Sequence, residues 1–130
     1  MNQNFLALGL EEVIVQAVDQ LGFEKPSPVQ KKCIPIVLNE DTDLVALAQT
    51  GTGKTLAFTI PMLNKLLKDK QAMALIICPT RELATQVMGT VLKLNVREIG
   101  IGNALLIGGE SMQKQLRPVS YTHLTLPTKA

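Results

Sequence analysis

A glycine-rich stretch, Ala48-Gln49-Thr50-Gly51-Thr52-Gly53-Lys54-Thr55, constrains the fold of this chain most strongly. A short apolar run over residues 44–47 precedes it, and a segment with helical spacing of apolar residues begins near its lysine. Glycines let successive backbone N–H groups point inward, and the following helix adds its unpaired N–H groups and positive dipole end. The stretch therefore predicts a phosphate-binding loop between a strand and a helix, as in a nucleoside triphosphate binder.

The loop matches the pattern G-x-x-x-x-G-K-[ST] except at its first position, which is Ala48. A small residue suffices there if φ stays negative. In this pattern Lys54 reaches the β- and γ-phosphates, and the Thr55 hydroxyl ligates Mg²⁺. The alternative is an ordinary turn followed by a lysine, and the flanking strand and helix favour the nucleotide site over it.

Composition sets wider bounds. With 130 residues and 46% hydrophobic content, the chain predicts one small domain with a core. The net charge of +2 does not by itself indicate nucleic-acid binding. Cys33 and Cys78 lie in apolar segments without metal-ligand spacing, which predicts reduced thiols and a cytoplasmic location. We expect neither a secretory signal nor a membrane span.

Helices and apolar runs alternate along the chain. Gly22 is typical of a helix end, and Ser27 followed by Pro28 is typical of a helix start. Pro35 and Pro61 predict kinks or early ends. Apolar spacing predicts helices over 10–21, 28–38, 54–68, from 79–84 to about 97, and 110–116, and strands over 44–47, 73–78 and 103–107. This alternation predicts an α/β fold with a parallel sheet and right-handed crossovers.

Four ordered motifs carry a family resemblance: Gly22–Gln30, Ala48–Thr55, Pro79–Ala84 and Gly108–Gly109. They resemble the Q motif, motif I, motif Ia and the GG element of DEAD-box ATP-dependent RNA helicases, and residues 1–118 resemble the N-terminal part of that family's ATP-binding domain. The resemblance implies a RecA-like parallel sheet with flanking helices, that is, a P-loop NTPase fold. It also implies ATP and Mg²⁺ as cofactors and RNA as a partner.

The base-reading residues point to adenine. A carboxamide can bond bidentately to adenine N6 and N7, so Gln30 is suited to this readout and Phe5 can supply a stacking face. The alternatives are an ordinary polar residue in a first helical turn for Gln30 and a hydrophobic staple for Phe5. The resemblance implies an ATP-binding set of Phe5, Lys25, Gln30, Gln49, Thr50, Gly51, Thr52, Gly53, Lys54 and Thr55, with Thr55 as a partial Mg²⁺ ligand.

A second set points to the RNA sugar-phosphate backbone. Thr80 can cap a helix whose free N–H groups, together with Arg81, can hold a phosphate. The resemblance implies that this phosphate belongs to RNA, bound independently of sequence by Pro79, Thr80, Arg81, Gly108 and Gly109. The alternative for Arg81 is a surface ion pair with Glu82.

Several family elements do not occur in the 130 residues, among them the Asp-Glu-Ala-Asp and Ser-Ala-Thr motifs. The strands that carry them should separate the 44–47 and 73–78 strands, so we expect unpaired apolar edges. We expect residues 119–130 to be an unrelated tail from a frameshift, vector or adaptor, with a divergent natural ending as the alternative. We expect the parent protein to couple ATP hydrolysis to RNA unwinding and this chain alone to be inactive. The alternatives are a non-catalytic nucleotide- or RNA-binding module, an inert truncation product and a DNA-acting relative.

Overall fold

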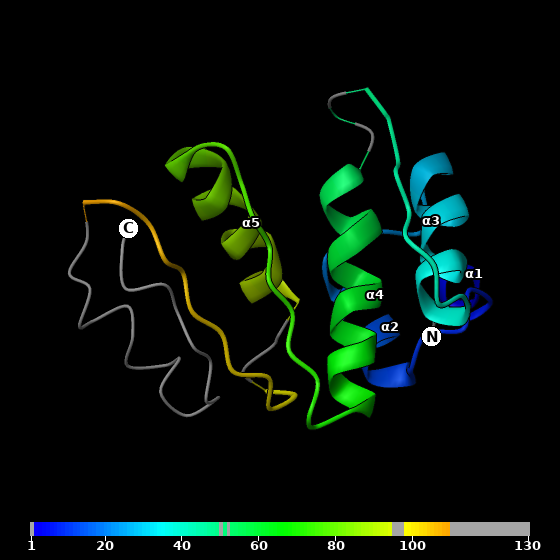
Figure 1. Ribbon diagram of the computed structural model, residues 1–130. Coiled ribbons are helices and arrows are strands. Elements are labelled where there is room, and N and C mark those ends of the chain that lie inside the picture. The colour runs from blue at the N-terminus through cyan, green and yellow to red at the C-terminus, as the bar shows by residue number, and fades with distance from the viewer. Residues whose placement is uncertain (1, 50, 52, 95–97, 110–130) are drawn as a thin grey trace.

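The computed structural model describes residues 2–49, 51, 53–94 and 98–109. Within them the chain forms five helices (Figure 1), and no helix is long and apolar enough to cross a membrane. The helices are α1 (Gln3–Leu6), α2 (Glu12–Gln20), α3 (Pro28–Asn39), α4 (Lys54–Lys68) and α5 (Arg81–Lys93).

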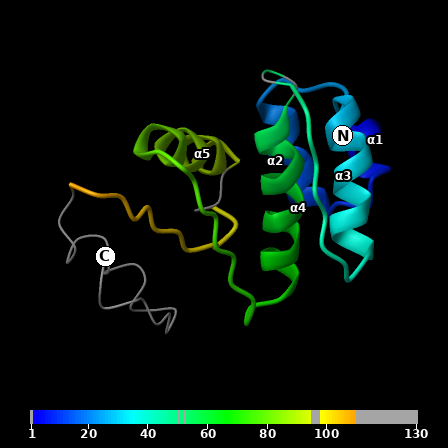
Figure 2. The ribbon, with the colours of Figure 1, turned by 45° about the horizontal axis from the view of Figure 1, so that its top comes forward.

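Helix α4 lies at the centre of the packing. Its apolar face, including Ile60 and Leu63, is buried where α4 packs against α2 and α3. Figures 1 and 2 both show α2, α3 and α4 grouped together, with α5 on the other side of α4. The core cluster draws on all five helices and their flanks: Phe5, Leu10, Ile14, Val15, Ala17, Val18, Ile34, Leu56, Ile60, Leu63, Val91 and Leu94.

The predicted helices are largely confirmed. Helix α2 ends before Gly22, whose φ of 84° suits a residue without Cβ. Helices α3 and α4 continue through Pro35 and Pro61 to Asn39 and Lys68. Helix α5 ends at Lys93, short of the predicted residue 97, and the predicted 110–116 helix lies outside the described residues.

Helix α1 was not predicted. The Asn2 side chain caps it by accepting bonds from the N–H groups of Asn4 and Phe5. The carboxamide nitrogens of Asn2 and Asn4 donate to the carbonyls of Phe23 and Glu24 at 2.7 and 3.0 Å. This short helix is therefore anchored to the turn that precedes α3.

The predicted parallel sheet is not formed in the described part of the chain, where no residue lies in a strand. Segments 44–47, 73–78 and 103–107 run extended and in the same general direction (Figure 1). Many of their apolar side chains are exposed, with Val45 at 84% and Ile77 at 83%. A strand satisfies its backbone groups through a neighbouring strand, and no strand ladder joins these described segments.

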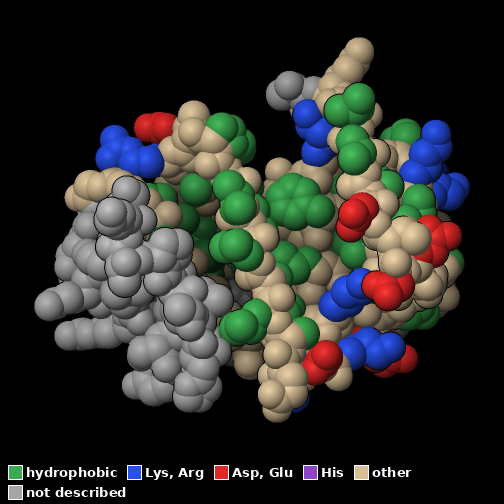
Figure 3. Space-filling view, viewed as in Figure 1, with side chains coloured by type: hydrophobic (Ala, Val, Ile, Leu, Met, Phe, Trp, Pro, Cys, Tyr) green, Lys and Arg blue, Asp and Glu red, His purple; other side chains and the backbone are tan. Residues whose placement is uncertain are grey.

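The exposed side chains of these segments contribute to an apolar surface. Figure 3 shows hydrophobic side chains gathered on the face of the molecule that is seen in Figure 1. The large exposed members from the extended segments are Leu44, Val45, Leu47, Met73, Leu75, Ile76, Ile77 and Leu106. These side chains are exposed, but the described residues form no strands, so the expectation of unpaired strand edges stays a prediction.

Candidate nucleotide and RNA-backbone sites

The phosphate-binding loop ends at the N-terminus of α4. Gly51 and Gly53 have φ values of 82° and 85°, in the left-handed region that favours glycine. Gly53 is the N-cap residue of α4, which places Lys54 and Thr55 in its first turn. Lys54 is exposed, while Thr55 is half-buried. Thr50 and Thr52, which belong to the predicted site, lie outside the described residues.

Gln30 joins the start of α3 to this loop. Its Oε1 accepts from the Ser27 N–H at 3.0 Å, and the Gln30 N–H donates to Ser27 Oγ at 3.4 Å, which completes a capping box. Its Nε2 donates to the Gly53 carbonyl at 3.2 Å. Gln30 is thus both the polar first-turn residue of one alternative and a direct contact of the phosphate-binding loop.

The approach of Gln30 leaves no room for a side chain at Gly53. A Cβ there would overlap Gln30 Nε2 and would lie 3.1 Å from Ser27 Oγ. A Cβ at Gly51 would meet nothing within 4 Å. The sequence motif contains both glycines, but it does not show that only Gly53 lies against Gln30. The S-x-x-Q spacing from Ser27 to Gln30 was the signal that could have shown which way the glutamine side chain turns.

The remaining predicted nucleotide ligands differ in exposure. Lys25 is exposed in the turn before α3, and Gln49 is exposed at the start of the loop. Phe5 has no exposed surface and packs in the core. Of the two roles considered for Phe5, apolar packing and stacking on a base, the structure shows apolar packing. Stacking on a base stays a prediction.

An apolar hollow of about 380 Å³ lies beside the loop, between α3, α4 and the segment that precedes the loop. Among the described residues that line it, Lys54 alone carries a charge. The lining residues are Val29, Cys33, Val37, Leu44, Ala46, Lys54, Ala57 and Phe58.

The predicted RNA-contacting residues meet at the start of α5. The Thr80 hydroxyl accepts from the Leu83 N–H at 3.1 Å, as expected for its N-cap role. Arg81 Nη1 donates to the Gly108 carbonyl at 3.1 Å. Gly109 has φ +84°, and a Cβ there would lie 2.9 Å from Arg81 Nη1. The structure therefore brings 79–81 and 108–109 together.

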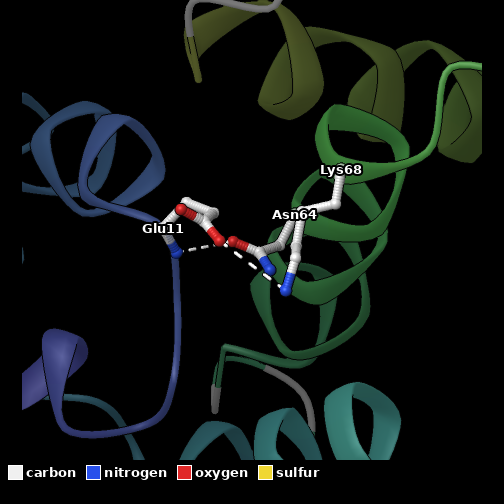
Figure 4. Close-up of polar contacts among 3 residues, drawn as sticks. All are labelled: Glu11, Asn64 and Lys68. Atoms are coloured by element: carbon white, nitrogen blue, oxygen red, sulfur yellow. Dashed lines mark hydrogen bonds and ion pairs between the residues drawn. The ribbon is translucent and has the colours of Figure 1, made fainter.

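The alternative ion pair between Arg81 and Glu82 is not formed. In the part of the chain that the structure describes, the one ion pair joins Lys68 Nζ and Glu11 Oε1 at 3.7 Å. That pair belongs to a polar contact between the start of α2 and α4 (Figure 4). There the Glu11 N–H donates to Oδ1 of Asn64 at 2.7 Å, and Asn64 is only 2% exposed. An asparagine on the apolar face of α4 was the sequence signal for this contact.

The two predicted sites lie at one edge of the molecule. The loop before α4 and the start of α5 both lie at the top of Figure 1, where the 44–47 and 73–78 segments also end. Ligands of open α/β proteins bind at the carboxyl ends of strands. Among the described residues, no cluster of three or more His, Cys, Asp or Glu could hold a metal ion.

Comparison with known proteins gives consistent matches. The sequence profile of the DEAD/DEAH box helicase family matches residues 27–130. The ATP-dependent rRNA helicase rrp3 of Aspergillus terreus is 46% identical over 114 residues, which cover 87% of this chain and 25% of that protein.

Solved structures agree. A DEAD box protein from the hyperthermophile Methanococcus jannaschii matches with a TM-score of 0.76 and 37% identity, over 88% of this chain and 31% of its own. The DEAD-box helicase Mss116, bound to ssRNA and UDP-BeF, matches with a TM-score of 0.77 and 34% identity, over 87% and 24%. The chain spans about a quarter of the length of the curated relatives it matches.

Proposed function

This chain belongs to the DEAD/DEAH box helicase family, and from that premise we propose that it carries the ATP-binding loop and an RNA-backbone contact of an ATP-dependent RNA helicase. The fold class we propose for the whole domain is a RecA-like parallel sheet with flanking helices, in which segments 44–47, 73–78 and 103–107 become strands.

One observation carries the proposal: Gln30 Nε2 donates to the Gly53 carbonyl at 3.2 Å across 23 positions of sequence. The residue proposed to read the base thereby lies against the loop proposed to hold the phosphates. One bound nucleotide must reach the base-reading residue with its base and the loop with its phosphates, so the two must lie within the length of a nucleotide. An isolated glycine-rich turn would give no reason for a buried carboxamide to be placed there.

The proposed phosphate chemistry follows from the first turn of α4. The unpaired N–H groups of the helix start and the exposed Lys54 ammonium are suited to anionic oxygens. The Thr55 hydroxyl offers one oxygen ligand for Mg²⁺, a cation that keeps several waters and takes most of its remaining ligands from phosphates. That donor set fits a metal ion held mainly by the nucleotide.

Gln30 has spare capacity for adenine. Its oxygen carries a second lone pair and its nitrogen a second hydrogen beyond the bonds to Ser27 and Gly53. Those two groups match the N6 donor and N7 acceptor of adenine. Guanine presents an O6 acceptor in place of that donor, so we propose ATP rather than GTP.

For RNA, we propose that the start of α5 and the Gly108–Gly109 turn contact the sugar-phosphate backbone. Support comes from the Arg81 guanidinium and the exposed glycines at one edge of the molecule. Backbone contacts of this kind carry no sequence information.

We propose that the 130-residue polypeptide binds ATP without hydrolysing it. Phosphoryl transfer needs a positioned water and metal-held charge, which the loop supplies only in part. The Asp-Glu-Ala-Asp motif that would supply the rest does not occur in the sequence. We propose that the enzyme activity, coupling of ATP hydrolysis to RNA unwinding, is that of the parent protein and not of these 130 residues alone.

Titration with a fluorescent ATP analogue in Mg²⁺ tests the proposal. Lys54→Ala should weaken binding more than about tenfold, because it removes the cation beside the phosphates. Lys65→Ala, an exposed lysine near the far end of α4, is the matched control and should bind as wild type. Equal affinity of wild type and Lys54→Ala would reject the phosphate site, and no saturable binding would favour an inert product.

A further inference from the structure

The guanidinium of Arg81 lies against the Gly108–Gly109 turn. Nη1 donates to the Gly108 carbonyl at 3.1 Å, across 27 positions of sequence. At Gly109 the left-handed φ of +84° disfavours any side chain, and a Cβ would lie 2.9 Å from Nη1. The hydrogen bond and the close approach therefore place the guanidinium directly on the turn, and the left-handed φ separately favours glycine at Gly109.

We propose that Arg81 is a positioning residue: it holds the Gly108–Gly109 turn beside the first turn of α5, so that both segments contact RNA as one surface. This inference rests on the proposed RNA contact. It assigns to Arg81 a role exerted through the turn, in addition to any charge that it presents to a phosphate.

The chemistry of arginine suits this role. A guanidinium is planar, with five N–H donors in a fixed fork, so one donor can hold a carbonyl while others face a second acceptor. Lysine carries its charge on a flexible stem and has no such fork. Thr80, the N-cap residue of α5, fixes the same helical turn, because its hydroxyl accepts a hydrogen bond from the Leu83 N–H. A turn ordered before RNA arrives avoids the entropic cost of ordering it on binding.

A double-mutant cycle tests the inference in the 130-residue chain. Affinity for a fluorescently labelled single-stranded oligouridylate is measured for Arg81→Ala, Gly109→Ala and the double variant. Each single change should weaken binding about three- to tenfold, which is the range for the net contribution of one typical hydrogen bond. The double variant should bind no more weakly than the weaker-binding single variant, because both substitutions disrupt the same contact between Arg81 and the turn. Fully multiplicative effects would overturn the proposal.

Arg81→Lys separates positioning from charge. It keeps the cation, so a purely electrostatic contact predicts near wild-type affinity and an unchanged salt dependence. Positioning predicts that Arg81→Lys binds as weakly as Arg81→Ala, while its slope of log affinity against log salt stays that of wild type. Lys93→Ala, at the exposed far end of α5, is the control and should change affinity less than about twofold. Wild-type affinity in Arg81→Lys would overturn the proposal.

A measurement without RNA distinguishes failure of this inference from failure of the proposed function. The amide signals of Gly108 and Gly109 in NMR spectra of the free chain should shift in Arg81→Lys and stay in place in Lys93→Ala. Unmoved signals in Arg81→Lys would overturn the positioning role even if RNA binds. Absence of saturable RNA binding by wild type would overturn the RNA contact, and with it the proposed consequence of positioning.

Discussion

Helices α2 to α4 and the extended segments of the same chain differ in how their apolar residues are used. Ile60 and Leu63 of α4 are buried to 0% and 1% exposure, whereas Leu47 and Ile77 of the extended segments are 94% and 83% exposed. Helical hydrogen bonds close within a segment, but a strand depends on a neighbour for its own. The helices therefore form from their own local sequence, whereas the extended segments form no sheet among the described residues.

The largest expected effect separates the two regions directly. Leu63→Ala removes a buried side chain between α4 and its neighbours and should lower the free energy of unfolding by about 2–5 kcal/mol. Ile77→Ala removes an exposed side chain and should change it by less than about 0.5 kcal/mol. Urea denaturation followed by circular dichroism at about 222 nm, where helices absorb, measures both. Equal losses of unfolding free energy in the two variants would show that the 73–78 segment is packed in solution. The difference between buried helices and exposed extended segments would then not hold.

Gly53→Ala should have the next largest effect. The added Cβ meets Gln30 Nε2 and forces a left-handed φ on alanine, which should cost about 2–3 kcal/mol of stability and most of the ATP affinity. Gly51→Ala has the same φ problem and open space around it, so it isolates the conformational part, about 1–2 kcal/mol. If both variants lose the same stability, the contact with Gln30 is not made.

Asn64→Ala tests the contact in Figure 4 that fixes the start of α2 on α4. It leaves the Glu11 N–H without its acceptor and should lower the free energy of unfolding by about 1–2 kcal/mol. Lys68→Ala removes only the exposed ion pair with Glu11 and should cost about 0–0.5 kcal/mol. The same urea titrations apply. A larger loss for Lys68→Ala than for Asn64→Ala would reverse our ranking of the two interactions.

The smallest expected change in stability is in the exposed segments, although the change in association should be clear. Leu47→Lys and Ile77→Lys each place a charge on the apolar surface and should leave the free energy of unfolding within about 0.5 kcal/mol. We expect the exposed apolar surface to drive self-association, so both variants should scatter less light than wild type, because charges oppose edge-to-edge pairing. Unchanged association would show that this surface does not drive it.

The helices were predictable because their signals are local. Gly22 ended α2, Ser27 with Pro28 began α3, and helical periodicity placed α4 over Lys54–Lys68. The end of α5 was placed too late, since Leu94 turns into the core as the residue after the helix. The strands were not confirmed among the described residues, because apolar runs indicate which segments could be buried, whereas strand pairing also needs a partner segment.

The sequence predicts a set of candidate site residues but not the contacts among them, and their roles in binding ATP or RNA stay predictions. The phosphate-binding loop and Thr80 as a cap followed from motifs and spacing, whereas the bond from Arg81 to the Gly108 carbonyl was not predicted. The bond from Gln30 to Gly53 and the burial of Phe5 depend on how α1 and α3 pack, which no local pattern states.

We propose above all that Gln30 and the 48–55 loop together form an adenine nucleotide site. The most direct test is a competition titration of wild type, in Mg²⁺, in which ATP and GTP displace a fluorescent ATP analogue. We predict that ATP competes at least tenfold better than GTP, about 1.4 kcal/mol, because the Gln30 carboxamide complements adenine N6 and N7. Equal competition by the two nucleotides would contradict the assignment of Gln30 to the base.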